Sequence, residues 1–388
     1  MLTGKNKITY FDNAASSWPK PEVVYQAMDD FMRNIGGNPG RSGHRVSIAA
    51  ARIIFEARES LAGLFGLADS SRIIFTANAT EALNLAIKGA LKKGGQVITS
   101  GFEHNSVMRP LRFLEQESKV QITSIGPSQD EMVDLRLLEK AITAQTKLIV
   151  SVHGSNVTGD IAPIEKISAI AKKHKIPFLV DASQTAGCMP IDLSRLEIDM
   201  LAFTGHKALL GPQGTGGLYI KEGIELAALK QGGTGSSSES ERQPDFLPDK
   251  YESGTPNTVG IAGLGAGVKY ILKTGIQEVW KKKKHLRAYL LKSLGSIDRI
   301  KIYGNLQPEG LAVVSFNLGD LSPSEIARQL SEKFAIMTRP GLHCSPLAHR
   351  TINTFPKGTL RASLSNFNTS QEIDHFIKCL KKIARNPA

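Results

Sequence analysis

The sequence contains little cysteine: its 388 residues include three, Cys188, Cys344 and Cys379. Their odd number and wide spacing exclude a disulfide framework and a zinc-binding pattern, so we expect free thiols, a reducing compartment and no metal site. The sequence also lacks any apolar run near the roughly 18 residues that a membrane span needs. Its N-terminus has no signal-like apolar stretch. We therefore expect a cytoplasmic protein that makes no membrane contact.

Acidic residues are fewer than basic ones: the chain has 36 Asp and Glu and 48 Lys and Arg, which gives a net charge of +12. Such a charge is typical of many nucleic-acid-binding proteins, so that alternative has to be weighed. The densest basic run, Lys281–Lys284, lies in a stretch with helical spacing of apolar residues, and no zinc-finger or RNA-binding motif accompanies it. We predict that its lysines occupy a solvated helix face and that the chain binds no nucleic acid.

Short β-branched runs alternate with helical stretches in the first two thirds of the chain. The runs cover residues 72–76, 96–100, 120–125, 147–153, 177–181, 200–204 and 217–220, and the helical stretches include 80–92, 134–144 and 163–175. This alternation predicts an α/β fold whose mostly parallel, seven-stranded sheet is covered on both faces. In such sheets the ligand lies beyond the carboxyl ends of the strands, so the residues that follow each run matter most.

The remaining segments predict a second, smaller domain. Helices are expected at 22–34, 47–65 and 259–294, a long functional loop at 232–258, and a C-terminal α/β unit with strands near 311–317, 334–338 and 358–363 and helices near 323–333 and 370–385. We predict an N-terminal segment (1–20) that packs with the small domain, a large domain (21–260) and a small domain (261–388).

Two strand ends carry a carboxylate and an amine. The apolar run 176–180 ends in Asp181, and the run 199–203 leads through Thr204-Gly205-His206 to Lys207 and a glycine-rich turn. Alone, Asp181 could cap the next helix, and Lys207 could be an ordinary loop lysine. Together they suit a pyridine cofactor, because a desolvated lysine forms a Schiff base and an aspartate keeps the ring nitrogen protonated.

Three further strand ends add polar groups to the same edge. The backbone N–H groups of Ala79 and Thr80, with the Thr80 hydroxyl, would form an anion site at a helix N-terminus, although Thr80 could simply be the N-cap of that helix. His104 could stack on a flat cofactor or transfer protons, or be a buried structural histidine. Asn156 reaches the same rim.

Cys344 differs from the other two cysteines in its surroundings. Lone cysteines are usually small buried apolar residues, which is how we interpret Cys188 and Cys379. Cys344 instead lies among turn-forming and basic residues, namely Pro340, Gly341, His343, Pro346 and His349. This setting favours an exposed thiolate.

Seven short segments together resemble the class V aminotransferase family of fold-type-I enzymes that use pyridoxal 5'-phosphate. The segments are FDNAAS, NATEA, EHNS, SNVTG, VDASQ, TGHK and SGTPNT, in the family's order across residues 10–365. The stretch Thr338–Ser345, with Leu360–Ser363 downstream, is similar to the cysteine desulfurase and selenocysteine lyase subgroup, nearest its group II members. The sequence departs from that pattern at Ala79, where relatives often have threonine, and at Leu342, where they often have histidine.

The resemblance implies a role for each matching residue. Lys207 would be the Schiff-base lysine, Asp181 the partner of the ring nitrogen, His104 the stacking residue, and Gln184 and Asn156 the contacts of the phenolic oxygen. The phosphate would be bound by Ala79, Thr80, Thr204 and His206, and by Thr255 of the neighbouring subunit in a homodimer. Arg361 would bind the substrate carboxylate, His44 and Asn156 would line the substrate site, and Cys344 would accept sulfur. Arg339 matches an arginine near the acceptor loop but receives no role.

The implied activity is the conversion of L-cysteine to L-alanine, with the sulfur passed to Cys344 as a persulfide and His104 accepting a proton from the substrate thiol. L-selenocysteine is an equally compatible substrate, and a sulfur-acceptor protein is an expected partner. A transaminase or another amino-acid lyase, in which Cys344 is incidental, remains an alternative. A non-catalytic nucleic-acid-binding protein is a more distant one, which an intact Lys207 and Asp181 disfavour.

Overall fold

The computed structural model of the chain describes residues 8–40, 43–118 and 120–385. Its central sheet contains β2 (Ile73–Thr76), β3 (Gly95–Ser100), β4 (Val120–Ile125), β5 (Thr146–Val152), β6 (Phe178–Asp181), β7 (Met200–Thr204) and β8 (Gly216–Ile220). The spatial order is β2-β8-β7-β6-β5-β3-β4. Only β8 runs antiparallel to its neighbours. The prediction of a mostly parallel, seven-stranded sheet is confirmed.

Helices cover both faces of this sheet. One face carries α3 (Ala79–Ala90) and α4 (Asn105–Ser118), and the other carries α2 (Arg45–Phe65), α5 (Leu135–Lys140), α6 (Ile164–Lys173) and α7 (Thr258–Thr274). In β6, Leu179 packs toward the first face, whereas Phe178 and Val180 pack toward the second. Because successive side chains point to opposite faces, a strand covered on both sides needs an uninterrupted apolar run.

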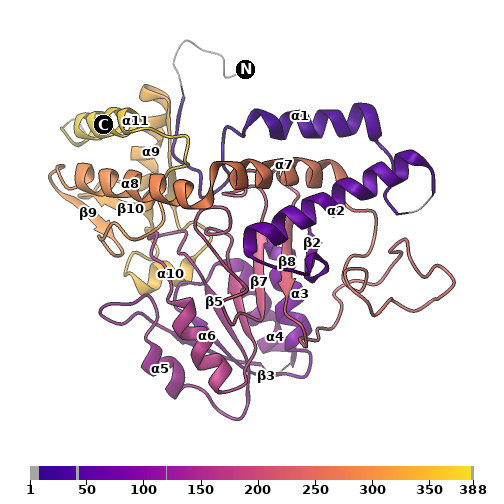
Figure 1. Cartoon of the computed structure of the whole chain (residues 1–388). Coiled ribbons are helices and arrows are strands. Elements are labelled where there is room, and N and C mark those ends of the chain that lie inside the picture. The colour runs from indigo at the N-terminus through magenta and orange to yellow at the C-terminus, as the bar shows by residue number, and fades with distance from the viewer. Residues whose placement is uncertain (1–7, 41–42, 119, 386–388) are drawn as a thin grey trace.

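Helix α1 (Glu22–Asp30) lies along α7 on the outside of the large domain (Figure 1). A π-helical turn, Phe31–Ile35, continues α1 and ends at Gly36, which has a φ of 58°. None of the helices in the described part of the chain is long and apolar enough to cross a membrane.

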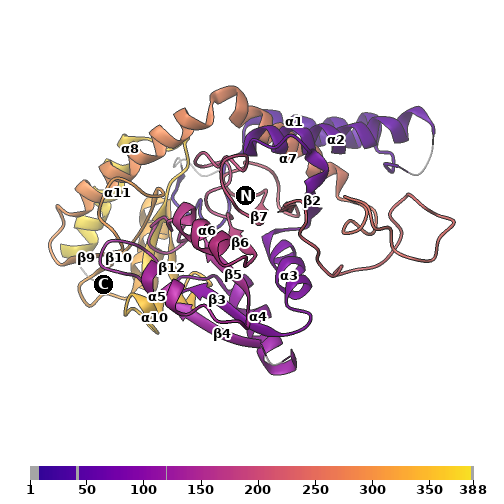
Figure 2. The same ribbon diagram turned by 60° about the horizontal axis from the view of Figure 1, so that its bottom comes forward.

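The small domain surrounds a four-stranded antiparallel sheet in the order β12-β13-β10-β9. Its strands are β9 (Ile300–Tyr303), β10 (Val313–Leu318), β12 (Arg339–Gly341) and β13 (Thr359–Ser363), and its helices are α8 (Ile276–Leu294), α9 (Pro323–Phe334), α10 (Pro346–Thr351) and α11 (Ser370–Arg385). The N-terminal strand β1 (Thr9–Tyr10) pairs in parallel with β11 (Ile336–Met337). Figure 2 shows the small domain beside the large sheet, with α7 and α8 running along both.

The predicted helix over 259–294 is wrong as a single element. It breaks at Gly275, whose φ of 85° suits glycine, so α7 and α8 are separate. The predicted boundary at residue 260 falls inside α7, whose Leu264 and Val268 belong to the core of the large sheet, whereas Leu286 in α8 belongs to that of the small domain. We therefore propose that the boundary lies at Gly275. Of the N-terminal segment 1–20, residues 1–7 lie outside the described residues.

The basic run of α8 only partly occupies a solvated face. Lys281 and Lys282 are exposed as predicted, but Lys283 is 8% exposed. Arg287, one turn later, is 1% exposed and donates to several backbone carbonyls. The prediction for the whole run is thus wrong at Lys283, because α8 packs between the two domains and turns that side of the helix inward.

Candidate active site

A cavity of about 220 Å³ opens where the carboxyl ends of β5, β6 and β7 meet the N-terminal segment and the small domain. Predicted residues that line it are Ala79, Thr80, His104, Asn156, Asp181, Gln184, Thr204, His206, Lys207 and Arg361. Arg339 and His343 line its small-domain side. These parallel strands end at one edge of the sheet, which brings together residues that are far apart in the chain.

Lys207 follows β7 and is held by its backbone: Ser17 Oγ donates to the Lys207 carbonyl at 2.7 Å. Burial lowers the pKa of Lys207 to about 8, Arg361 and Arg339 act in the same direction, and Asp181 opposes them. Part of the Lys207 population is therefore neutral near pH 7. A neutral amine in a cavity can attack a carbonyl group, which is what covalent attachment of a cofactor requires.

Asp181 and His104 lie beside Lys207 with fixed orientations. Asp181 is 3% exposed, and its Oδ1 accepts from both Ser183 N, at 2.9 Å, and Ser183 Oγ. His104 Nδ1 accepts from Ser106 N at 3.1 Å, and burial, with the charge of Lys207, lowers the pKa of His104 to about 4. The neutral ring then carries its proton on Nε2. This nitrogen is a donor, which argues against the predicted acceptance of a thiol proton there.

Helix α3 begins at the cavity, and Thr80 is not its N-cap. Its N-cap is Asn78, whose Oδ1 accepts from Glu81 N at 3.0 Å. The alternative that Thr80 is simply the N-cap is therefore wrong, because Thr80 already lies in the first turn, where its hydroxyl contacts Ser106 Oγ at 2.8 Å. The N–H groups of Ala79 and Thr80 have no intrahelical acceptor and remain available to an anion.

The opposite side of this anion site comes from the end of β7. Thr204 lines the cavity, and its hydroxyl makes only a long hydrogen bond, of 3.4 Å, to Thr215 O. His206 Nδ1 is buried and has no hydrogen-bond partner among the described residues. Burial lowers the pKa of His206 to about 4. A buried nitrogen of this kind normally has a partner, so its orphaned state fits a ligand at this position.

Two predicted cofactor contacts are occupied by protein groups. Asn156 Nδ2 donates to His343 O at 2.8 Å, and Asn156 Oδ1 accepts from Ser345 Oγ at 2.8 Å. Gln184 Nε2 donates to Ala14 O at 3.0 Å. The Asn156 amide thus ties the acceptor loop to the end of β5, while Asn156 also lines the cavity, so its predicted contacts with cofactor and substrate stay predictions. Gln184 still presents Oε1.

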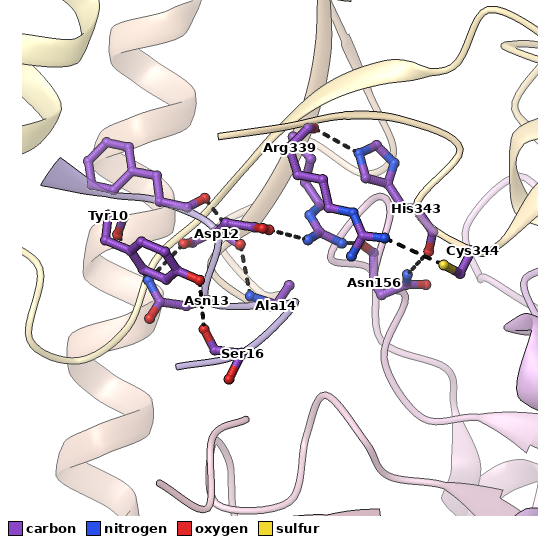
Figure 3. A network of polar contacts seen from close by, with 12 residues as sticks. Tyr10, Asp12, Asn13, Ala14, Ser16, Asn156, Arg339, His343 and Cys344 are labelled. Atoms are coloured by element: carbon purple, nitrogen blue, oxygen red, sulfur yellow. Dashed lines mark hydrogen bonds and ion pairs between the residues drawn. The ribbon is translucent and has the colours of Figure 1, made fainter. Parts of the chain in front are cut away.

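Arg361 is 1% exposed and already paired. Its NH2 lies 2.6 Å from Asp12 Oδ1, and its NH1 donates to Asn156 O at 3.0 Å. Asp12 belongs to the N-terminal segment (Figure 3). Arg361 Nε has no hydrogen-bond partner among the described residues, so a substrate carboxylate gripped by Nε and NH2 would compete with Asp12 at NH2 alone. Asp12 was not predicted as a site residue, although it lies in FDNAAS, one of the seven segments that resemble the family.

Cys344 is exposed, as predicted, and Cys188 and Cys379 are buried; all three are free. Arg339 NH2 donates to Cys344 Sγ at 3.4 Å (Figure 3). Asn105 N donates to Cys344 O at 2.8 Å. A cationic donor therefore lies against the Cys344 sulfur. This contact gives Arg339 a partner, whereas the sequence left its role open.

Two predicted site residues lie elsewhere. His44 is the exposed N-cap of α2, where its Nδ1 accepts from Ser47 N at 3.2 Å. Thr255 is exposed in the long loop after β8. Neither is among the residues that line the cavity. A single chain therefore does not bring His44 or Thr255 into the site.

Glu103 was missed as a functional candidate. It is fully buried, and burial raises its pKa to about 8. Its Oε1 accepts from Ser100 Oγ and, at 2.8 Å, from Val152 N, which joins β3 to β5 beneath His104. The sequence does contain a sign of this residue: Glu103 is an acidic residue that directly precedes His104, just after a buried strand.

Comparison with known proteins decides the family. Residues 9–376 match the family Aminotransferase class-V. The chain belongs to the class V aminotransferase family. Among its relatives, a probable cysteine desulfurase of Methanothermobacter thermautotrophicus is 35% identical over 382 residues, 97% of this chain and 94% of the relative. A probable cysteine desulfurase of Pyrococcus abyssi is 36% identical over 392 residues, 98% of this chain and 95% of the relative.

Solved structures agree with this assignment. The apo structure of a cysteine desulfurase from Thermococcus onnurineus NA1 superimposes on this class V aminotransferase with a TM-score of 0.91 at 32% identity, covering 97% of this chain and 95% of that one. The predicted family, the similarity to cysteine desulfurases and the predicted fold class are confirmed.

Proposed function

We propose that this class V aminotransferase is a cysteine desulfurase that binds pyridoxal 5'-phosphate and converts L-cysteine to L-alanine. The observation that carries the proposal is the contact of Arg339 with Cys344 at the rim of the cavity that holds Lys207. A transaminase needs a lysine and a carboxylate site but no thiol. The relatives named cysteine desulfurase support the same conclusion.

The cavity residues fit pyridoxal 5'-phosphate. Lys207 would hold the cofactor covalently, Asp181 would pair with its ring nitrogen, and His104 would lie against the ring. Four groups would bind the phosphate: the Ala79 N–H, Thr80, Thr204 and the orphaned nitrogen of His206. When bound, the cofactor supplies an electron sink that weakens bonds to the substrate's α-carbon and, after loss of the α-proton, the Cβ–S bond.

The chain's own groups perform the proton and carboxylate steps. Lys207, with a pKa of about 8, has a neutral fraction whose Nζ can accept the α-proton of the substrate. Arg361 would bind the substrate carboxylate once Asp12 is displaced from its NH2. His104, neutral and with its proton on Nε2, is placed to donate a hydrogen bond there rather than to accept a proton.

Sulfur transfer falls to Cys344. The Cys344 thiolate attacks the substrate sulfur, a sulfur–sulfur bond forms, and the substrate C–S bond breaks. The electron pair of the broken bond stays with the carbon fragment, which is protonated and leaves as L-alanine. Arg339 holds the thiolate charge before the attack. The resulting persulfide is exposed, so a sulfur-acceptor protein could take it, and L-selenocysteine would follow the same path.

The proposal includes a homodimer with shared sites and a cytoplasmic location. Thr255 lies exposed in the loop over 232–258, and the long segment between β8 and α7 reaches away from the body of the molecule in both views (Figures 1 and 2). A loop of this kind suits a contribution to the phosphate site of a second copy. The three free cysteines are typical of a reducing compartment.

The test measures sulfide and alanine released from L-cysteine by the holoenzyme, in parallel with transamination of a keto acid. Cys344→Ala should lose persulfide formation and most sulfide release, while the visible cofactor band survives. Cys188→Ala is the matched control, because that thiol is buried, and should retain activity. Release of sulfide by Cys344→Ala at the wild-type rate, or transamination alone, would show that the proposal is wrong.

A further inference from the structure

The loop that carries Cys344 adopts an unfavourable backbone conformation. Ser345 N donates to Leu342 O at 2.9 Å, which closes a four-residue turn whose central residues, His343 and Cys344, have φ values of 51° and 58°. This is the φ pattern of a type I′ turn, which is normally occupied by Asn-Gly or a similar pair. His-Cys does not favour it, so the surroundings have to hold the turn in place.

Backbone and amide contacts fix one side of the turn. Asn105 N, at the start of α4, donates to Cys344 O at 2.8 Å, and Asn156 Nδ2 donates to His343 O at 2.8 Å. Both anchors belong to the large domain, and both hold carbonyl groups. They restrain the path of the main chain but not the side of the turn that faces the small domain.

A row of buried side chains holds that other side. His343 is 3% exposed, and its Nε2 lies 3.0 Å from Arg339 O, while its Nδ1 lies 3.1 Å from His349 Nε2. His349 is fully buried, and its Nδ1 lies 2.7 Å from Thr354 Oγ1. The two imidazole rings are stacked, with centroids 5.3 Å apart.

The direction of these hydrogen bonds follows from the carbonyl at one end. Arg339 O can only accept, so His343 carries its proton on Nε2 and, when neutral, accepts at Nδ1. His349 must then donate from Nε2 and accept at Nδ1 from the Thr354 hydroxyl. Burial and the nearby charge of Arg361 lower the pKa of His349 to about 4 and that of His343 to about 2, which keeps both rings neutral. The row from Thr354 to Arg339 is thus complete only with neutral histidines.

We propose that His349 is a positioning residue that acts through His343 to hold the Cys344 turn, and thereby keeps the Cys344 sulfur on the Arg339 guanidinium. The Arg339 end of the row reaches both partners of that contact, because His343 bonds the backbone of Arg339 and directly precedes Cys344 in the chain. The importance of the contact for turnover rests on the proposed function, but the positioning itself does not.

The test is the rate of alkylation of Cys344 by iodoacetamide in the substrate-free holoenzyme. Cys188 and Cys379 are buried, so the reaction reports Cys344. His349→Leu removes the donor to His343 and should slow alkylation about fivefold, the loss of roughly one hydrogen bond between neutral groups. His349→Gln places an N–H donor where Nε2 was and should restore the rate to within about twofold of wild type.

A double-mutant cycle separates positioning from a general structural effect. If His349 acts through the Arg339–Cys344 contact, His349→Leu should change nothing further in an Arg339→Gln background. An unchanged alkylation rate in His349→Leu, no rescue by His349→Gln, or a full effect in the Arg339→Gln background would each overturn the proposal. If far-UV circular dichroism shows that His349→Leu does not fold, Thr354→Val is used instead. A wild-type alkylation rate in Thr354→Val would also overturn the proposal.

Sulfide release provides the second measurement. His349→Leu should lower kcat for L-cysteine about fivefold and leave KM and the visible cofactor band unchanged, because the thiol acts after the substrate is bound. A wild-type enzyme that releases no sulfide would refute the proposed function. The alkylation experiment would still decide whether His349 positions the turn.

Discussion

Glu103 should make the protein less stable as the pH rises, because its carboxyl group is neutral in the fold. The side chain is fully buried, and burial raises its pKa from the ordinary 4.5 to about 8. Between these values the folded protein binds a proton that the unfolded chain has released, so the free energy of unfolding falls with rising pH. The loss begins near pH 4.5 and is complete once the pH passes 8. At pH 7 it amounts to about 3 kcal/mol.

Glu103→Gln should remove this loss. Glutamine keeps an Oε1 acceptor for Ser100 Oγ and Val152 N. Glu103 Oε2 has no hydrogen-bond partner among the described residues, so replacing this oxygen by the amide nitrogen breaks no hydrogen bond. The variant should exceed wild type in stability by about 1 kcal/mol at about pH 5 and by about 4 kcal/mol at about pH 8. Exposed Glu309 provides the matched control, since Glu309→Gln should show no such divergence.

Urea unfolding followed by far-UV circular dichroism across this pH range measures the difference. The buried histidines also titrate, but they are common to both proteins and cancel in the comparison. A Glu103→Gln variant whose unfolding free energy falls with pH as steeply as that of wild type would show that Glu103 is ionised in the fold. A variant less stable than wild type at about pH 8 would refute the reasoning as well.

Three further predictions concern residues that connect the domains or hold the cofactor. Arg287→Met should destabilise the protein by about 3–5 kcal/mol, because it removes a buried side chain that bonds several carbonyls. The control Arg299→Met removes an exposed ion pair and should cost under about 1 kcal/mol. Equal urea midpoints for the two variants would contradict this prediction. Lys207→Ala should give no covalent pyridoxal adduct after borohydride reduction while wild type gives one, and peptide mass spectrometry that finds the adduct on another lysine would exclude Lys207. Thr255→Ala should retain less cofactor after dialysis than wild type, and a fully occupied, active monomer by sedimentation would rule out the shared site.

The sequence alone determined which residues reach the cavity from the sheet. Strand residues bury both faces, so each strand appears as an apolar run, and the polar residue after the run must lie at the strand end. Asp181, Lys207 and His104 could be placed in this way, as could the exposed Cys344, whose neighbours form turns. These are local properties, and an apolar run or a turn signature is complete within a few residues of chain.

Only the tertiary structure decided what these residues contact. Asp12 and Arg361 are 349 positions apart, and the sequence around either residue does not indicate that the two form an ion pair. The Asn156 amide was predicted to meet the cofactor, but the fold places the acceptor loop against it first. Lys283 was predicted to be solvated, because its run is locally polar, yet α8 packs between two domains that the run itself cannot reveal. Local pattern fixes an element and its end, whereas the partner of a buried polar group depends on which distant segment the fold brings beside it.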